Sequence, residues 1–171
     1  MTRWLRFVIT GVFAFFRSKA VPPEEIRYTF WTWFQDADVH IVNNASLLSY
    51  TELGRLDFLI RSRLFFHLLR EGIYFPSAAT HMTFVRPLKR FQKLELRTKL
   101  IYWDPKWIWV EQNLYYRKNG ESVLANRSIM RGTFRKGRLA IPFDEILKGI
   151  GIPLAKMEKP DVIAKLERVE I

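Results

Sequence analysis

Apolar residues recur at helical spacing in one long segment of the chain, residues 45–69. Five of them follow one another at intervals of three or four positions: Leu53, Leu56, Ile60, Leu64 and Leu68. This spacing places them on one face of an α-helix and leaves the arginines of the segment off that face. Asn44 is a candidate N-cap, and Gly72 is a candidate stop. We therefore predict one long amphipathic helix.

Most of the remaining chain shows the two-residue alternation of half-buried strands. The alternation is clearest over residues 93–102, where charged residues alternate with Leu94, Leu96, Thr98 and Leu100. The dipeptide Asn119-Gly120 separates two such segments and is a strong signal for a tight hairpin turn. The other predicted strands cover residues 26–33, 78–85, 107–116 and 122–135, and a short helix is expected over residues 143–148.

The order of elements is one strand, one long helix and then a run of antiparallel strands. A helix with one apolar stripe can share a core with half-buried strands when the sheet curls around it. We therefore predict an α+β fold, a curved antiparallel sheet wrapped around a long central helix, although periodicity alone also allows other α+β folds. The 171 residues suit one such domain over residues 21–152, with a helix over residues 1–20 and a peripheral tail over residues 153–171.

The N-terminal segment places an apolar run between basic residues. Arg3 and Arg6 precede the run 7–16, and Arg17 and Lys19 follow it. A membrane-spanning helix needs about 20 apolar residues, roughly twice this run, and a signal peptide needs a small-residue cleavage site that the segment lacks. Two readings remain open. The helix docks on the domain or on a second subunit, or it lies among lipid headgroups with its basic residues near phosphates.

Composition narrows the classes of function. The formal charge of +11, from 28 basic and 17 acidic residues, favours anionic partners. No zinc-finger spacing and no RNA-binding aromatic motif accompanies this charge, so we expect no nucleic-acid partner. The chain has no cysteine, which excludes disulfides and thiolate catalysis and fits a reducing compartment. No spacing of histidines and carboxylates points to a metal site, and we expect neither metal nor cofactor.

The segment from residue 34 to residue 55 carries a recognisable pattern. It reads Phe34-Gln35-Asp36-Ala37-Asp38, then Asn43-Asn44, then Leu53-Gly54-Arg55. Arg86-Pro87-Leu88 and Phe91-Gln92 follow in order, and a Trp-Asp turn comes after them. Over residues 26–150 this ordered set resembles the hot-dog thioesterases of the 4-hydroxybenzoyl-CoA thioesterase type.

The resemblance implies a hot-dog fold and hydrolysis of an acyl thioester, carried by coenzyme A or acyl carrier protein, in a homodimer or homotetramer. A carboxylate before or on the central helix would act on the thioester. The first N–H groups of that helix would polarise the thioester carbonyl. Thioester hydrolysis does need a base or nucleophile and donors for the developing oxyanion, and a helix N-terminus has free donors. We expect a cytoplasmic protein, with residues 1–19 as the candidate for peripheral membrane contact.

By this resemblance, Asp38 corresponds to the loop carboxylate of the family. Glu52 corresponds to the acid that another branch carries on the helix. Asn43 and Asn44 would position the oxyanion donors at the helix start. His40 stands near the histidine of the family pattern, in a stretch that is one residue shorter than usual.

The loop after residue 85 supplies candidates for binding coenzyme A. Arg86, Lys89 and Arg90 cluster there and could bind its phosphates, although the same cluster also suits a solvated loop. Simpler roles exist for two acids, because Asp36 can serve a turn and Glu52 can pair with an arginine one turn along the helix.

The short stretch before the helix also motivates an alternative function, a membrane-associated protein that binds acyl-CoA or lipid without catalysis.

Overall fold

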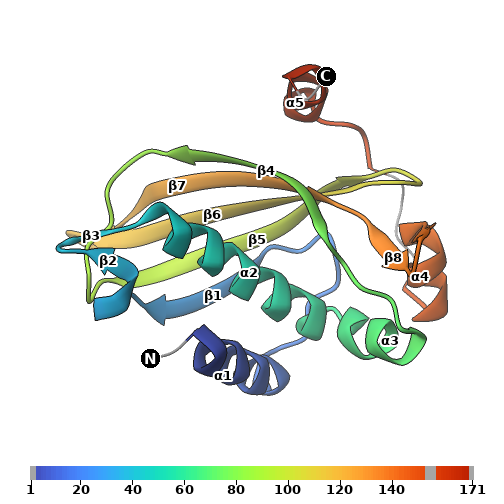
Figure 1. Ribbon diagram of the computed structural model, residues 1–171, viewed down its shortest axis with the longest axis horizontal. Helices are drawn as coiled ribbons and strands as arrows, with labels where there is room; N and C mark the ends of the chain where they lie inside the picture. The colour runs from blue at the N-terminus through green and yellow to red at the C-terminus, as the bar shows by residue number, and fades with distance from the viewer. Residues whose placement is uncertain (1–2, 153–156, 170–171) are drawn as a thin grey trace.

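The computed structural model describes residues 3–152 and 157–169. Its centre is a five-stranded antiparallel sheet with the strand order β1-β5-β6-β7-β4, which curves along helix α2 (Figure 1). The strands of this sheet are β1 (Ile26–Trp31), β4 (Ser77–Phe84), β5 (Lys93–Trp103), β6 (Ile108–Lys118) and β7 (Glu121–Gly132). The prediction of an α+β fold with a curved antiparallel sheet around a central helix is confirmed.

Shorter elements complete the described chain. Two small hairpins are formed by β2 (Ala37–Asp38) with β3 (Ile41–Val42) and by β8 (Phe134–Lys136) with β9 (Leu139–Ile141). The helices are α1 (Arg3–Phe16), α2 (Asn44–Arg61), α3 (Leu64–Glu71), α4 (Phe143–Gly149) and α5 (Asp161–Val169), with a 3-10 turn at Phe34–Asp36.

Helix α2 packs against the sheet at an unusually close approach. A Cβ atom at Gly54 would lie 2.8 Å from Thr98 Oγ1 and closer still to a methyl group of Leu96, so only glycine fits this position. Beside it, Gln112 Nε2 donates to the Thr51 carbonyl at 2.8 Å and reaches Thr98 Oγ1 at 3.4 Å. These hydrogen bonds link α2 to β5 and β6 inside an otherwise apolar interface.

The predicted long helix is two helices, and its predicted cap is off by one residue. Asn43 rather than Asn44 is the N-cap, because its Oδ1 atom accepts from the Ser46 N–H at 2.8 Å. The helix breaks after residue 61, where the Ser62 hydroxyl donates to the Phe58 carbonyl at 2.6 Å and Arg63 adopts a left-handed backbone. The apolar stripe continues across the break, which is why periodicity does not reveal it. The predicted stop at Gly72 is confirmed.

The strand predictions hold over most of the sheet. In β5, the buried positions alternate as expected, and Asn119 and Gly120 both have the positive φ angles of a tight hairpin turn. The predicted strand over residues 122–135 is wrong at its end. It divides after Gly132, where a Cβ atom would lie 2.5 Å from the Phe75 ring, and residues 134–136 pair with β9 instead.

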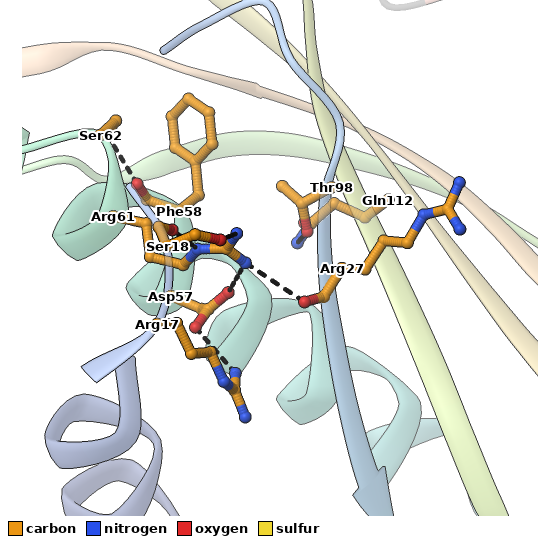
Figure 2. Close-up of polar contacts among 9 residues, drawn as sticks. All are labelled: Arg17, Ser18, Arg27, Asp57, Phe58, Arg61, Ser62, Thr98 and Gln112. Atoms are coloured by element: carbon orange, nitrogen blue, oxygen red, sulfur yellow. Dashed lines mark hydrogen bonds and ion pairs between the residues drawn. The ribbon is translucent and has the colours of Figure 1, made fainter. Parts of the chain in front are cut away.

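Helix α1 docks on α2 and on the adjacent edge of the sheet (Figure 1). Figure 2 shows the ion pairs that fix its end, where the buried Asp57 carboxylate contacts Arg17 Nη1 at 3.0 Å and Arg61 Nη1 at 3.4 Å. Arg61 also donates to the backbone carbonyls of Ser18 and Arg27. Among the helices that the structure describes, none is long and apolar enough to cross a membrane.

The predicted tail includes a helix on the far side of the sheet from α2. Ile163 of α5 is fully buried and packs with Trp109 and Ile129 of the sheet. Residues 153–156 and 170–171 of the predicted tail lie outside the described part of the chain.

Candidate functional site

The start of α2 brings three of the predicted site residues together. Asp38 ends β2, and its Oδ1 atom accepts a hydrogen bond from Asn43 Nδ2 at 3.3 Å. The other side-chain atom of Asn43 caps the helix through the Ser46 N–H. The N–H groups of Asn44 and Ala45 belong to the first helical turn, where no intrahelical acceptor exists. One carboxylate and two free amides therefore lie close together, with Asp38 on the exposed side.

His40 and Glu52 lie apart from this group. His40 is exposed at the tip of the β2–β3 hairpin, and among the described residues only its backbone finds hydrogen-bond partners. One of these bonds runs from the His40 N–H to the Asp38 carbonyl at 2.7 Å. Glu52 is about two turns along α2 and forms an ion pair with Arg55 at 3.8 Å. Burial lowers the pKa of Arg55, and Glu52 offsets part of that effect. Glu52 thus has the pairing role that the sequence also allowed.

Glu52 and Asn44 line a groove between α2 and the edge strand β4. The groove has a volume of about 470 Å³ and continues over the apolar side chains of Leu48, Met82 and Phe84. Leu48 and Phe84 are each about half exposed. Within the part of the chain that the structure describes, β4 pairs only with β7, so its outer edge has no ladder partner there. The groove is therefore open along that edge.

A second cavity, of about 440 Å³, lies on the other side of the α2 start, beneath α1. Asp36, not Asp38, is the carboxylate that lines it. Asp36 is buried and holds Arg6 through two hydrogen bonds of 2.9 and 2.6 Å, and it also accepts from the Trp33 N–H. The expected turn role of Asp36 is thus only part of what it does. Burial, and next the charge of Asp36, raise the pKa of Tyr50 in this cavity, so its phenol stays neutral.

Sequence reasoning missed Arg6 as a partner of Asp36. The two residues are thirty positions apart, and the placement of the N-terminal segment was open. The available signal was Arg6 itself, a basic residue directly before an apolar run.

The predicted coenzyme A loop is attached to the hairpin that carries Asp38. The backbone of Lys89 bridges to Ile41, and the Arg90 N–H reaches the His40 carbonyl at 3.4 Å. Arg86 directs its guanidinium elsewhere, to the Leu124 carbonyl at 2.9 Å. Lys89 and Arg90 are therefore near the helix start, and their side chains contact no carboxylate in the described chain. The side chain of Arg86, in contrast, is already hydrogen-bonded to the Leu124 carbonyl. Nowhere in residues 3–152 and 157–169 do three histidines or acids gather as metal ligands.

Comparisons with solved structures identify the fold. 4-Hydroxybenzoyl CoA thioesterase from Pseudomonas sp. strain CBS-3 matches with a TM-score of 0.63 at 18% identity, over 72% of this chain and 97% of that one. The probable thioesterase YbaW from Escherichia coli matches with a TM-score of 0.65 at 19% identity, over 73% of this chain and 96% of that one. At these identities the likeness establishes a shared hot-dog fold.

Sequence comparisons identify the family. The Probable thioesterase YBR096W of Saccharomyces cerevisiae is 30% identical over 86 residues, which are 50% of this chain and 36% of the yeast protein. The chain thus matches about a third of the length of that curated relative. Residues 30–153 match the model of the Thioesterase-like superfamily. Since this match spans well over half of the sequence and the hot-dog fold agrees with it, the chain belongs to the Thioesterase-like superfamily.

Proposed function

We propose that the protein hydrolyses an acyl-CoA to a free acid and coenzyme A, with Asp38 as the catalytic carboxylate. The observation that carries this proposal is the link from Asp38 through Asn43 to the opening of α2. It holds a base beside two amides that have no acceptor of their own. These are the two kinds of group that thioester hydrolysis requires.

In the proposed reaction, the thioester carbonyl oxygen lies against the N–H groups of Asn44 and Ala45. Asp38 accepts a proton from water as the water oxygen attacks the carbonyl carbon. The amides stabilise the negative charge on the former carbonyl oxygen. The carbon–sulfur bond then breaks, and the thiolate of coenzyme A leaves and takes up a proton. Direct attack by Asp38, through an anhydride that water then opens, uses the same groups.

Lys89 and Arg90 would bind the phosphates of coenzyme A. Their loop is tied to the Asp38 hairpin by backbone contacts, so phosphates held there would lie on the same side as the reacting carbonyl. Charge-assisted hydrogen bonds to phosphate are among the stronger polar contacts of proteins, and Lys89 and Arg90 have no carboxylate neighbour in the described residues to weaken them.

A second copy of the chain would complete the site. The groove between α2 and β4 is apolar, is lined by Asn44 and Glu52, and is open along an unpaired strand edge. A partner strand along β4 would satisfy that edge and close the groove around an acyl chain. We therefore propose a homodimer as the working unit, with the acyl chain in this groove.

Thiol release from a panel of acyl-CoA substrates tests the function. We expect Asp38→Asn to lower kcat by about a hundredfold or more with a smaller change in KM, because a neutral amide cannot accept the proton. Asp161→Asn, which removes an exposed carboxylate on α5, is the matched control and should leave the rate unchanged. The rate of Glu52→Gln shows whether Glu52 rather than Asp38 is the catalytic acid. An unchanged rate in Asp38→Asn would remove this residue from the mechanism.

The exposure of Asp38 favours one alternative, an acyl-CoA-binding protein without turnover. A carboxylate in water is a weaker base than a desolvated one, and in the single chain Asp38 lies on the open side of the helix start. Saturable binding of acyl-CoA with no thiol release by the wild-type protein would decide for this alternative.

A further inference from the structure

Over residues 4–16, helix α1 turns its polar side chains toward the protein and most of its large apolar side chains outward. Arg6 and Thr10 are buried, with Arg6 paired to Asp36 and Thr10 Oγ1 at 2.7 Å from the Tyr28 hydroxyl. Between residues 4 and 16 the exposed positions are all large and apolar: Trp4, Leu5, Val8, Val12, Phe13, Phe15 and Phe16. Trp4 and Phe16, at the two ends, are 81% and 84% exposed. A helix on a protein surface in water normally has the opposite polarity.

The apolar surface continues onto α3. The rings of Phe15 and Phe66 are in contact, with centroids 5.3 Å apart, and Phe66 and Leu69 are 57% and 68% exposed. We call the outward residues of α1 together with Phe66 and Leu69 the outer apolar face. Contiguous exposed apolar surface of this kind marks a site of interaction.

A basic cleft borders the outer apolar face where α1 ends and α3 begins. It has a volume of about 540 Å³ and contains four basic residues: Arg17, Lys19, Arg61 and Arg63. Arg17 and Arg61 share the Asp57 carboxylate. Lys19 and Arg63 are exposed and contact no carboxylate in the described residues. The cleft therefore offers two uncompensated cations directly beside apolar side chains.

We propose that the outer apolar face docks on an anionic phospholipid bilayer, with α1 lying flat in the interface and a lipid phosphate bound between Lys19 and Arg63. An apolar helix face bordered by cations matches the layered structure of a bilayer surface, in which anionic phosphates lie above acyl chains. The polar side of α1 already has its partners inside the protein, so the helix needs no rearrangement to bind. A two-fold pairing of two chains across this face would instead bring two basic clefts into one interface.

Co-sedimentation with vesicles tests the proposal. We expect the intact chain to bind vesicles of phosphatidylcholine mixed with phosphatidylserine, and to bind phosphatidylcholine alone at least about tenfold more weakly, because the cations lose their phosphate-rich surface. Trp4→Ala with Phe16→Ala should weaken binding to the mixed vesicles at least about tenfold. The control, Leu139→Ala, removes a side chain that is 70% exposed on β9 and should bind as the wild type does.

Charge reversal tests the basic cleft separately. Lys19→Glu with Arg63→Glu should weaken binding to the mixed vesicles at least about tenfold, whereas Lys99→Glu with Lys118→Glu changes the net charge equally at exposed strand positions and should weaken it far less. An equal loss of vesicle binding in the two double variants would overturn the proposed role of the cleft. Absence of binding by the intact chain would overturn the whole proposal. So would a halving of the sedimentation mass by Trp4→Ala with Phe16→Ala, because a second copy would then cover the face.

Discussion

Asp57 is a fully buried carboxylate whose two partners come from distant segments of the chain. Arg61 lies one turn further along α2, while Arg17 follows the end of α1 (Figure 2). Burial raises the pKa of Asp57 and outweighs the two arginines, which lower it. The Asp57 carboxylate therefore ties the end of α1 to the domain, although its burial is unfavourable. It stabilises the fold because it pairs with both arginines.

We expect Asp57→Ala to lower the free energy of unfolding by about 3 kcal/mol, because it removes the carboxylate that Arg17 and the largely buried Arg61 share. Chemical denaturation monitored by circular dichroism measures this. Glu25→Ala is the control, since it removes the exposed pair with Arg27 and should cost at most about 1 kcal/mol. A loss in Asp57→Ala no larger than that of the control would contradict the argument.

At the residue scale, the sequence could bring together candidate residues that are close along the chain, while their catalytic roles stay predictions. Asp38, Asn43 and Asn44 lie within seven positions of one another, and a helix cap is a local event, so the pattern was enough to place them together. Asp36 and Arg6 are separated by the whole first strand, and their pairing depends on where α1 docks. No local pattern contains that information, which is why the lining of the cavity beneath α1 was not foreseen.

At the scale of elements, the α2–sheet contact depends on a missing side chain at Gly54. We expect Gly54→Ala to lower the free energy of unfolding by about 2 kcal/mol, because the new methyl group must displace the Thr98 hydroxyl and a Leu96 methyl. Gly11→Ala is a matched control on α1. There the added Cβ would lie 3.9 Å from the nearest atom, so the helix-favouring alanine should be neutral or stabilising. Equal effects of the two substitutions would show that crowding at α2 is not the cause.

The proposed dimer can be tested in the groove between α2 and the edge strand β4. Leu48→Arg places a charge on the open side of the α2–β4 groove, where the side chain is 46% exposed in the single chain. We expect the fold to persist, the sedimentation mass to halve and thiol release to fall at least about tenfold, because a buried unpaired charge would disfavour the partner. Leu139→Arg, on β9, should change neither. A Leu48→Arg protein of unchanged mass would argue against a dimer through this groove.

At the scale of the whole molecule, the order of elements predicted an α+β architecture, and the resemblance to hot-dog thioesterases singled out one fold among those that this order allows. One apolar helix stripe and five half-buried strands have few ways to share a core, and the hot-dog arrangement is one of them. The same information could not orient the outer helices. The sequence pattern identified the apolar run of α1. The rule that apolar residues face the core would turn Phe15 and Phe16 inward. In the structure the basic residues Arg6 and Arg17 point inward instead, because they pair with the buried carboxylates of Asp36 and Asp57.

The charge of +11 leads to a prediction about substrate capture. Coenzyme A carries several phosphate charges, so the field of the whole protein should speed the encounter with acyl-CoA, and salt should screen it over a Debye length of about 8–10 Å at physiological ionic strength. We expect kcat/KM for acyl-CoA to fall several-fold between low and physiological salt, while the same acyl group on uncharged N-acetylcysteamine shows little change. Lys89→Ala with Arg90→Ala should lower kcat/KM for acyl-CoA and leave the uncharged substrate unaffected, which separates local phosphate contacts from the long-range field. If both substrates respond to salt alike, ionic strength acts on the protein itself and charge does not guide the substrate.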